Sequence, residues 1–534
     1  MADQEPAEEA PEEKPPRSKA RRITYIVLHV LLHVIFIAHF IGATVVFILF
    51  DKESDECPGN ILCKMNWCHG YGFLIVIFVI FYILWLYYWV FKPYVGIKLY
   101  NNYLEPAIDK WIVFSRKLIV SGVMLLIVIS LAVAYLGYEC RYDATKAIGL
   151  LGPVTFLLIG FAVSKHHKRV PWRIVTHGLL GQLLLGIFCL RAPFGRSIFE
   201  CLGEKVSLFL GYANYGARFV YGDRICDDYV FAFAILAVVF FFSVISSIMY
   251  YLGWMQFILN GLGFLLQAMV GTTVCESVNA AANIFLGMSE SPLVIRPYIL
   301  ILTVSELHTI CTSGYSTVAG TVLGAYVSFG ASPAFLITAS VMAAPGSLAF
   351  SKLFYPETEE SLTRSDNIQL EKSPDSSILD AAASGAAAAL MIVLGIVSNI
   401  IAFLAVMFFL NALTEWTFEL IVFLMGVPWE DCQQIGLVVA EKSLINEFVA
   451  YKHLGQLVRE NKVGSRSASI ATFALCGFAN PGSLGILIAA LSAMAPARRS
   501  DITRVAVRAF FAGSFVSFTS ASLAGILIQD DFTS

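Results

Sequence analysis

Residues 283–297 read NIFLGMSESPLVIRP, an apolar stretch that a glycine, a carboxylate and two prolines interrupt. A second stretch of this kind, residues 443–450, reads SLINEFVA and carries a carboxylate next to an amide. A carboxylate buried among apolar residues costs several kcal/mol unless a partner, a cation or a ligand satisfies it. The two motifs, centred on Glu290 and Glu447, therefore predict a buried polar site in an apolar protein.

The whole chain is unusually apolar. Its 534 residues are 57% hydrophobic and 14% charged, with a mean hydropathy of +0.73, whereas a soluble protein carries roughly 25% charged residues. A net charge of −3 gives no basic surface for nucleic acid. The sequence therefore predicts an all-α polytopic membrane protein. Its apolar runs are Ile23–Phe50, Phe73–Val90, Leu118–Leu136, Ile148–Val163, Phe231–Leu252 and Ala389–Leu410.

Two long segments break this pattern of uninterrupted apolar runs. Glycine, proline, asparagine and glutamate interrupt both Leu262–Pro297 and Gly426–Gly485. The segments occupy corresponding places in two halves of the chain, which the polar stretch Tyr355–Asp380 separates; we interpret that stretch as a mobile loop. Irregular backbone survives at membrane depth only where it surrounds a site, and such paired segments are typical of secondary transporters. The pattern predicts two re-entrant hairpins.

Charged residues outside the apolar runs indicate the topology. Residues 1–22 are acidic, proline-rich and then basic, which predicts a disordered tail whose basic end lies in the cytosol. The loops before Leu118 and after Val163 are also basic, in agreement with a cytosolic N-terminus. Between Ala192 and Val220, apolar residues recur at helical spacing among charges, which predicts an amphipathic helix that lies in an interface or against another subunit.

The two acidic motifs admit a structural and a functional interpretation. In the structural one, Glu290 pairs with Arg296 and Glu447 with Lys442 to hold the hairpins shut. In the functional one, the carboxylates accept hydrogen bonds from a polar, uncharged solute. The sequence alone leaves both open, although intramembrane carboxylates are functional by default.

A third polar motif, CGFANPGS at residues 476–483, adds the amide of Asn480 and the hydroxyl of Ser483 next to a predicted helix break. These two residues either cap a helix or bind the solute, and the sequence does not separate the two roles.

Cysteines carry little information, because only Cys57, Cys63 and Cys68 cluster. A disulfide within that cluster fits an extracellular loop, and its third thiol would stay unpaired.

From about Ser164 to Leu527 the sequence closely resembles the sodium-coupled concentrative nucleoside transporters of the vertebrate type. The matching segments, in the order of the family, are SKHH, VPWR, FVYGD, NIFLGMSESPLVIRPY, SELHTI, SGYSTVAGTVLGAY, SVMAAP, KLFYPETEES, MGVPWED, NEFVAYKHL, ALCGFAN, SLGI, MAPARRSDI and AGIL. Segments before residue 100 match only in layout.

This resemblance implies a homotrimer, in which each subunit has a scaffold and a transport domain with two inverted repeats. Each repeat is a re-entrant hairpin followed by a broken helix. The implied organisation is a tail at 1–22, N-terminal transmembrane helices at 23–145, scaffold helices with an interfacial helix at 146–222, a gate and the first repeat at 223–354, a polar loop at 355–380, and a long span with the second repeat at 381–534.

The resemblance also implies the binding residues. Those expected to face the nucleobase are Met288, Ser289, Glu290, Thr321 and Val322. Those expected around the ribose are Glu447, Asn480 and Ser483, with Phe478 packed on the ligand. Those expected at the sodium site are Asn283, the backbone of Leu286, Thr317 and Val318, and such oxygen ligands suit a hard cation.

Met288 bears on selectivity. Pyrimidine-preferring and broad family members typically carry glutamine at this position, and its amide can pair with a pyrimidine edge. A thioether is polarizable and offers no donor. The resemblance is therefore to the purine-preferring subtype, with uridine left open as a further substrate.

The predicted function is sodium-dependent import of purine nucleosides across the plasma membrane by alternating access, with no enzymatic activity. Alternatives are proton coupling through Glu447 or Glu290, broad selectivity, and a transport-dead form, because Asn411–Met425 is shorter than the family's counterpart and Pro481 replaces an aliphatic residue. A membrane-embedded enzyme acting on lipid would need a histidine near a carboxylate. The nine histidines lie mostly in the first span and in loops.

Overall fold

A computed structural model describes residues 19–50, 67–96, 130, 132–141, 144–227, 230–363 and 373–528. Every regular element in these ranges is a helix, and seven stretches are long and apolar enough to cross a membrane. This confirms the predicted all-α polytopic architecture. The chain divides into two compact units, residues 1–122 and 123–534, and each is described by itself.

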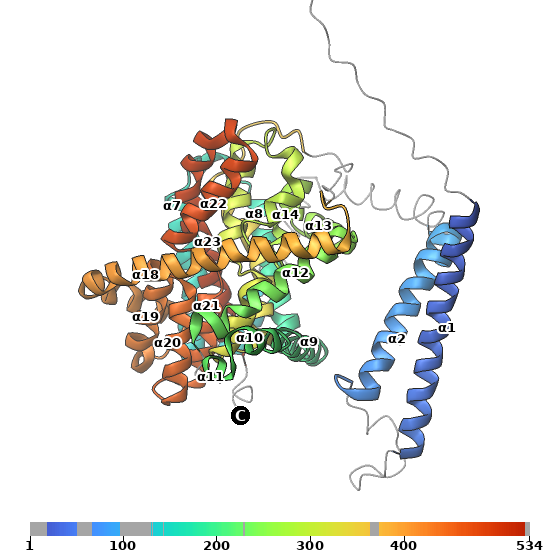
Figure 1. Cartoon of the computed structure of the whole chain (residues 1–534). Coiled ribbons are helices and arrows are strands. Elements are labelled where there is room, and N and C mark those ends of the chain that lie inside the picture. The colour runs from blue at the N-terminus through green and yellow to red at the C-terminus, as the bar shows by residue number, and fades with distance from the viewer. Residues whose placement is uncertain are drawn as a thin grey trace, which may run out of the picture. The chain divides into compact units, whose positions relative to one another are not determined.

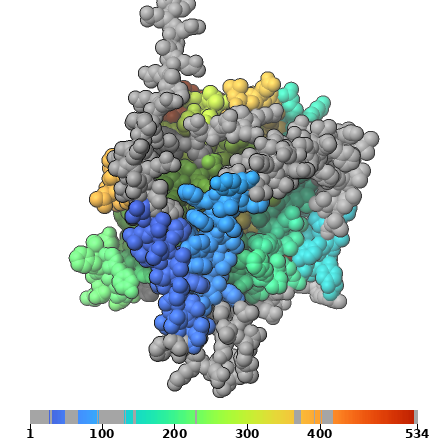
Figure 2. Space-filling view, turned by 90° about the vertical axis from the view of Figure 1, so that its right-hand side faces the viewer, coloured from blue at the N-terminus to red at the C-terminus, as the bar shows by residue number. Residues whose placement is uncertain are grey.

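In the first unit, helices α1 (Lys19–Phe50) and α2 (Gly70–Leu86) lie side by side (Figures 1 and 2). The rings of Phe40 and Phe78 stack between them, with centroids 4.0 Å apart. Most of the described apolar side chains on both helices are exposed within this unit, as expected for helices that face lipid. A π-helical stretch, η1 (Tyr87–Gly96), continues α2.

The structure limits three of the sequence predictions for the N-terminal part of the chain. Because α1 begins at Lys19, the last four residues of the predicted 1–22 tail are helical. The predicted span Leu118–Leu136 lies largely outside the described residues. Cys68 forms a disulfide bond, whereas Cys57 and Cys63 are outside the described ranges.

Four helices form the centre of the second unit: α8 (Trp172–Gly186), α15 (Val304–Ser316), α17 (Pro333–Phe354) and α23 (Arg499–Leu527). Helix α15 packs against α17 and α23, and α17 packs against α8. Small residues permit this close approach: a Cβ on Gly178 would lie 2.6 Å from the carbonyl oxygen of Pro345. All side chains of α15 and nearly all of α17 are buried, so these helices form a rigid centre.

The two predicted repeats are present, each with a hairpin followed by a broken helix. The first consists of α14 (Val274–Ala282), the 3₁₀ helix η6 (Ser291–Tyr298), α15 and α16 (Gly320–Ser328). The second consists of α19 (Trp429–Leu444), α20 (Glu447–Arg459), α21 (Ser465–Leu475) and α22 (Pro481–Met494). Both sequence segments that glycine, proline and asparagine interrupt therefore form the predicted elements.

The long helix α18 (Ile378–Leu424) runs across this unit and packs against α12 (Ala237–Tyr251) (Figure 1). Ser243 on α12 donates a hydrogen bond of 2.8 Å to the carbonyl of Gly385 on α18. Helix α18 continues without a break through most of the shortened Asn411–Met425 segment, so this segment extends a long span.

The predicted helix between Ala192 and Val220 is present as two helices that meet at Tyr212, α9 (Pro193–Gly211) and α10 (Ala213–Tyr221). Further helices of the unit are α6 (Ala144–Gly149), α7 (Leu151–Ala162), η3 (His167–Arg169), η4 (Ile187–Arg191), α11 (Asp223–Asp227), η5 (Phe231–Ile235), α13 (Trp254–Val270) and η7 (Pro496–Arg498).

The first part of residues 355–380, which the sequence predicts as a mobile loop, is hydrogen-bonded to α15. Ser361 and Thr363 each donate a hydrogen bond of 2.6 Å to Oε1 of Glu306, at the beginning of α15. Ser305 donates another, of 2.7 Å, to the carbonyl of Tyr355. The chain after α17 is therefore fastened to α15 up to Thr363, because side chains near the beginning of α15 supply both a carboxylate and a hydroxyl.

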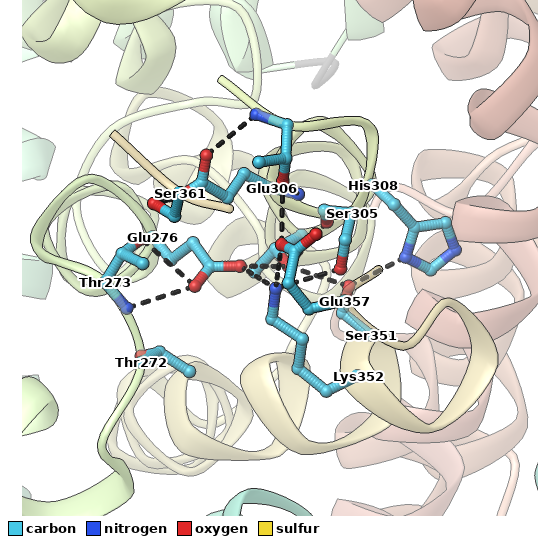
Figure 3. A network of polar contacts seen from close by, with 12 residues as sticks. Thr272, Thr273, Glu276, Ser305, Glu306, His308, Ser351, Lys352, Glu357 and Ser361 are labelled. Atoms are coloured by element: carbon cyan, nitrogen blue, oxygen red, sulfur yellow. Dashed lines mark hydrogen bonds and ion pairs between the residues drawn. The ribbon is translucent and has the colours of Figure 1, made fainter. Parts of the chain in front are cut away.

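A buried lysine lies at the centre of the same polar network (Figure 3). Nζ of Lys352 is 2.5 Å from Oε1 of Glu276 and 3.6 Å from Oε2 of Glu357. Thr309 on α15 donates a hydrogen bond of 2.7 Å to Glu276, which also joins a capping box with Thr273 at the beginning of α14. The network fastens the base of the first hairpin to α15 and α17.

Candidate functional site

A cavity of about 240 Å³ lies where the tips of the two hairpins, the two helix breaks and α18 meet. All nine residues expected at the substrate site line it: Met288, Ser289, Glu290, Thr321, Val322, Glu447, Phe478, Asn480 and Ser483. These residues come from four segments far apart in the sequence, so the fold brings together two halves of one site.

Two side chains among the described residues donate hydrogen bonds to Glu447. Its Oε1 accepts a bond of 3.1 Å from the hydroxyl of Tyr326 on α16, and its Oε2 accepts one of 2.8 Å from Nδ2 of Asn480. Nζ of Lys442 has no hydrogen-bond partner among the described residues and lies 5.7 Å from the ring of Phe518. The carboxylate is therefore positioned by neutral groups, and not by a hydrogen-bonded ion pair with Lys442.

Asn480 and Pro481 together begin helix α22. Asn480 is the N-cap, and its Oδ1 accepts a hydrogen bond of 2.9 Å from the backbone N–H of Ser483. Proline is favoured directly after an N-cap, because the missing N–H would have no helical partner there. Pro481 is thus compatible with the orientation of Asn480, which caps the helix and also contacts Glu447.

The first hairpin places the second carboxyl group beside a glycine. The Glu290 side chain folds back over Gly287, so that a Cβ added at Gly287 would overlap its Oε2. This Oε2 is buried and has no hydrogen-bond partner in the described part of the chain. The pairing with Arg296 that the structural interpretation requires does not satisfy this oxygen, which leaves it available to a ligand.

The four residues expected to bind sodium lie at the junction of the first hairpin with the break after α15. Asn283 ends α14, Leu286 is in the hairpin tip, and Thr317 and Val318 follow α15 directly. Oδ1 of Asn283 is buried without a hydrogen-bond donor among the described residues. An amide oxygen that lacks a donor fits a hard cation, so this donor set suits sodium.

Sequence reasoning missed one wall of the cavity and one hydrogen-bond donor. Ile392, Gly395 and Ile396 of α18 also line the cavity. They belong to a long apolar run, and the sequence of such a run does not distinguish an isoleucine that lines a cavity from one that faces lipid. Tyr326 was also missed, because nothing local in the sequence links its hydroxyl to Glu447.

Three family models match the chain. "Na+ dependent nucleoside transporter N-terminus" matches residues 151–224, "Nucleoside recognition" matches residues 232–333, and "Na+ dependent nucleoside transporter C-terminus" matches residues 335–525. Together they extend over most of the second unit, including both hairpins and both broken helices.

Curated relatives agree with these matches. Solute carrier family 28 member 3 of Eptatretus stoutii is 40% identical over 488 residues, which cover 85% of this chain and 70% of the relative. Sodium/nucleoside cotransporter 1 of Rattus norvegicus is 41% identical over 427 residues, which cover 74% of this chain and 66% of the relative.

A solved structure shows that the likeness extends to the fold. CNTnw in an inward-facing substrate-bound state is similar with a TM-score of 0.67 and 35% identity, over 72% of this chain and 98% of that one. The family models cover the part of the chain that contains the cavity. The chain therefore belongs to the family of sodium-dependent nucleoside transporters.

Proposed function

We propose that this protein imports purine nucleosides together with sodium across the plasma membrane. The observation that carries the proposal is the cavity itself, in which polar groups suited to a ribose lie on the second repeat and an apolar Met288 lies on the first. A nucleoside has the same division between a sugar rich in hydroxyl groups and a flat base. The cavity is thus complementary in chemistry to a nucleoside.

On the ribose side, Glu447 and Asn480 already form a hydrogen-bonded pair. The carboxylate retains lone pairs for sugar hydroxyls, and charge-assisted hydrogen bonds of this kind are strong. Ser483 adds a hydroxyl, and Phe478 offers a ring against which the ligand packs. We assign these four residues to the ribose.

On the base side, Met288, Ser289 and Glu290 form the hairpin tip, with Thr321 and Val322 on the neighbouring helix α16. Met288 donates no hydrogen bond, so recognition of a pyrimidine edge by an amide is lost there. Its flexible, polarizable thioether accommodates the larger purine. This supports a preference for inosine, guanosine and adenosine.

Sodium is assigned to Asn283, Leu286, Thr317 and Val318, at the base of the same hairpin tip. The backbone N–H of Gly320 donates a hydrogen bond of 2.9 Å to the carbonyl of Phe285, which ties the tip to the helix break. A cation that orders this junction also orders the base-recognition residues that follow it. Each ligand then raises the affinity for the other by the same factor.

Transport proceeds by alternating access in a homotrimer embedded in lipid, with the N-terminus in the cytosol. The repeats and their hairpins move as a transport domain relative to the scaffold, which includes α12 and α18. The contact between Ser243 and Gly385 keeps these two scaffold helices together. The apolar wall of α18 offers a moving nucleoside few polar contacts to break.

Uptake of radiolabelled inosine in cells that lack nucleoside transporters tests this function. The cells are assayed in sodium and in choline, each at pH 5.5 and at pH 7.5. Uptake that needs sodium at both pH values is the expected result. Uptake that follows pH without sodium would instead assign coupling to protons, and no uptake despite surface expression would identify a transport-dead form.

A further inference from the structure

Two asparagines one helical turn apart on α14, Asn279 and Asn283, converge on a single residue of α15. Nδ2 of Asn279 donates a hydrogen bond of 2.8 Å to Oγ of Ser313, and Nδ2 of Asn283 donates one of 3.1 Å to the same atom. Asn283 also donates to the backbone carbonyl of Asn279, at 2.9 Å. All three side chains are fully or almost fully buried.

This arrangement leaves both amide oxygens without a donor. The only hydroxyl hydrogen of Ser313 is directed to the carbonyl of Ile310, at 3.0 Å. Oδ1 of Asn279 and Oδ1 of Asn283 consequently have no hydrogen-bond partner among the residues described. If the oxygen and nitrogen of one asparagine amide exchanged places, its oxygen could accept the hydroxyl hydrogen of Ser313. The oxygen of the other asparagine would still have no donor.

An unsatisfied buried acceptor is energetically unfavourable, so two of them on side chains that share Ser313 Oγ require an explanation. A bound nucleoside cannot satisfy the oxygen of Asn279, because this residue does not line the cavity and is completely buried. Two neighbouring amide oxygens without donors make a negative potential in a low-dielectric surrounding. A small, hard cation is the ligand that such oxygens prefer.

The position of Asn279 relative to the sodium residues supports this explanation. Thr309 and Ser313 lie one turn apart on α15, and Thr317 follows its end and donates a hydrogen bond of 3.0 Å to the carbonyl of Ser313. Thr309 contacts Glu276, Ser313 contacts Asn279 and Asn283, and Thr317 belongs to the sodium site assigned above. Asn279 therefore lies one layer below that site, between the same two helices.

We propose that Asn279 Oδ1 is a further cation ligand, which extends the sodium site from Asn283 one helical turn down α14. This inference rests on the proposed function, because the cation is the coupling ion of that transport. Oδ1 of Asn279 binds the cation, while its Nδ2 donates a hydrogen bond to Ser313. Asn283 uses its two side-chain atoms in the same way.

The test measures the sodium concentration that gives half-maximal inosine uptake, and the inosine KM at saturating sodium, for three variants. Asn279→Leu keeps the size and removes the oxygen, and should raise the half-maximal sodium concentration about tenfold or more. Asn279→Asp adds negative charge and should lower it. Ser277→Ala on the same helix removes only a hydrogen bond with Thr272, of 2.9 Å, and should leave it unchanged.

The inference is overturned if Asn279→Leu and Asn279→Asp both keep the wild-type sodium response. It is also overturned if both variants lose sodium affinity, inosine affinity and surface expression in parallel. That result is expected if Asn279 has only a structural role. If Asn279→Leu fails to reach the surface, Asn279→Asp decides alone. Wild-type uptake that needs no sodium would reject the proposed function itself, which separates the two failures.

Discussion

Asn480 holds the carboxylate of Glu447 and begins helix α22 at the same time. Its Nδ2 donates a hydrogen bond of 2.8 Å to Glu447 Oε2, while its Oδ1 accepts one of 2.9 Å from the backbone N–H of Ser483. The helix break and the orientation of the carboxylate are thus a single structural feature. A change in either residue should therefore affect the geometry of the whole ribose side of the cavity.

Replacing Glu447 with glutamine should lower the kcat/KM of inosine uptake about 10- to 100-fold, because a charge-assisted hydrogen bond contributes about 1.5–3 kcal/mol. The measurement is initial-rate uptake, normalised to protein at the cell surface. Glu441→Gln serves as the control: Glu441 lies in the same hairpin, contacts His453 at 2.9 Å and does not line the cavity. Equal effects of both substitutions would contradict a direct role of Glu447.

Met288→Gln should increase uptake of thymidine or cytidine relative to inosine, because an amide at the hairpin tip can pair with a pyrimidine edge. Competition between labelled inosine and a panel of unlabelled nucleosides measures the change. Met288→Leu keeps an apolar side chain of similar size and should retain the purine preference. An unchanged profile for Met288→Gln would show that this residue does not face the base.

Gly287→Ala should abolish most uptake without preventing folding. The new Cβ would overlap Oε2 of Glu290, and this flexible carboxylate can swing away at little energetic cost. The substitution then moves the Glu290 carboxylate away from its position in the cavity, while the protein keeps its stability. Gly485→Ala is a matched control in α22, since no atom lies within 4 Å of the Cβ it would add. Normal uptake by Gly287→Ala would mean that the position of Glu290 is unimportant.

Lys352→Met should destabilise the protein by about 3–5 kcal/mol, because it leaves buried Glu276 without its cation. Thermal unfolding in detergent measures the loss. Lys462→Met removes a largely exposed ion pair with Glu460 and should change stability by less than about 1 kcal/mol. Adding Glu276→Gln to Lys352→Met should restore part of the lost stability. If the double variant is no better, the charge of Glu276 is not the cause.

The residues that define the cavity could be predicted where burial makes polar atoms costly. Glu290, Glu447 and Asn480 interrupt apolar segments, and this contrast is visible in one sequence. The wall formed by Ile392 and Ile396 gives no such contrast, because an apolar side chain has the same preference for lipid as for a cavity wall.

Partners distant in the sequence could not be predicted either. Tyr326 donates to Glu447 across 121 residues, and the fastening of Thr363 to Glu306 spans 57. Polar composition after α17 suggested a mobile loop, but the same serine and threonine hydroxyls satisfy a buried carboxylate. The effect of Pro481 also required the structure, because only there does its place directly after an N-cap become clear.

The charge of the cavity has a consequence for metabolism. Two carboxyl groups line it, and its described lining residues include no lysine, arginine or histidine. A phosphate group in that position would meet like charges without a basic partner. Once a cellular kinase phosphorylates an imported nucleoside, the product should no longer be a substrate. If the protein imports nucleosides as proposed, phosphorylation would thus prevent the product from leaving through the same cavity.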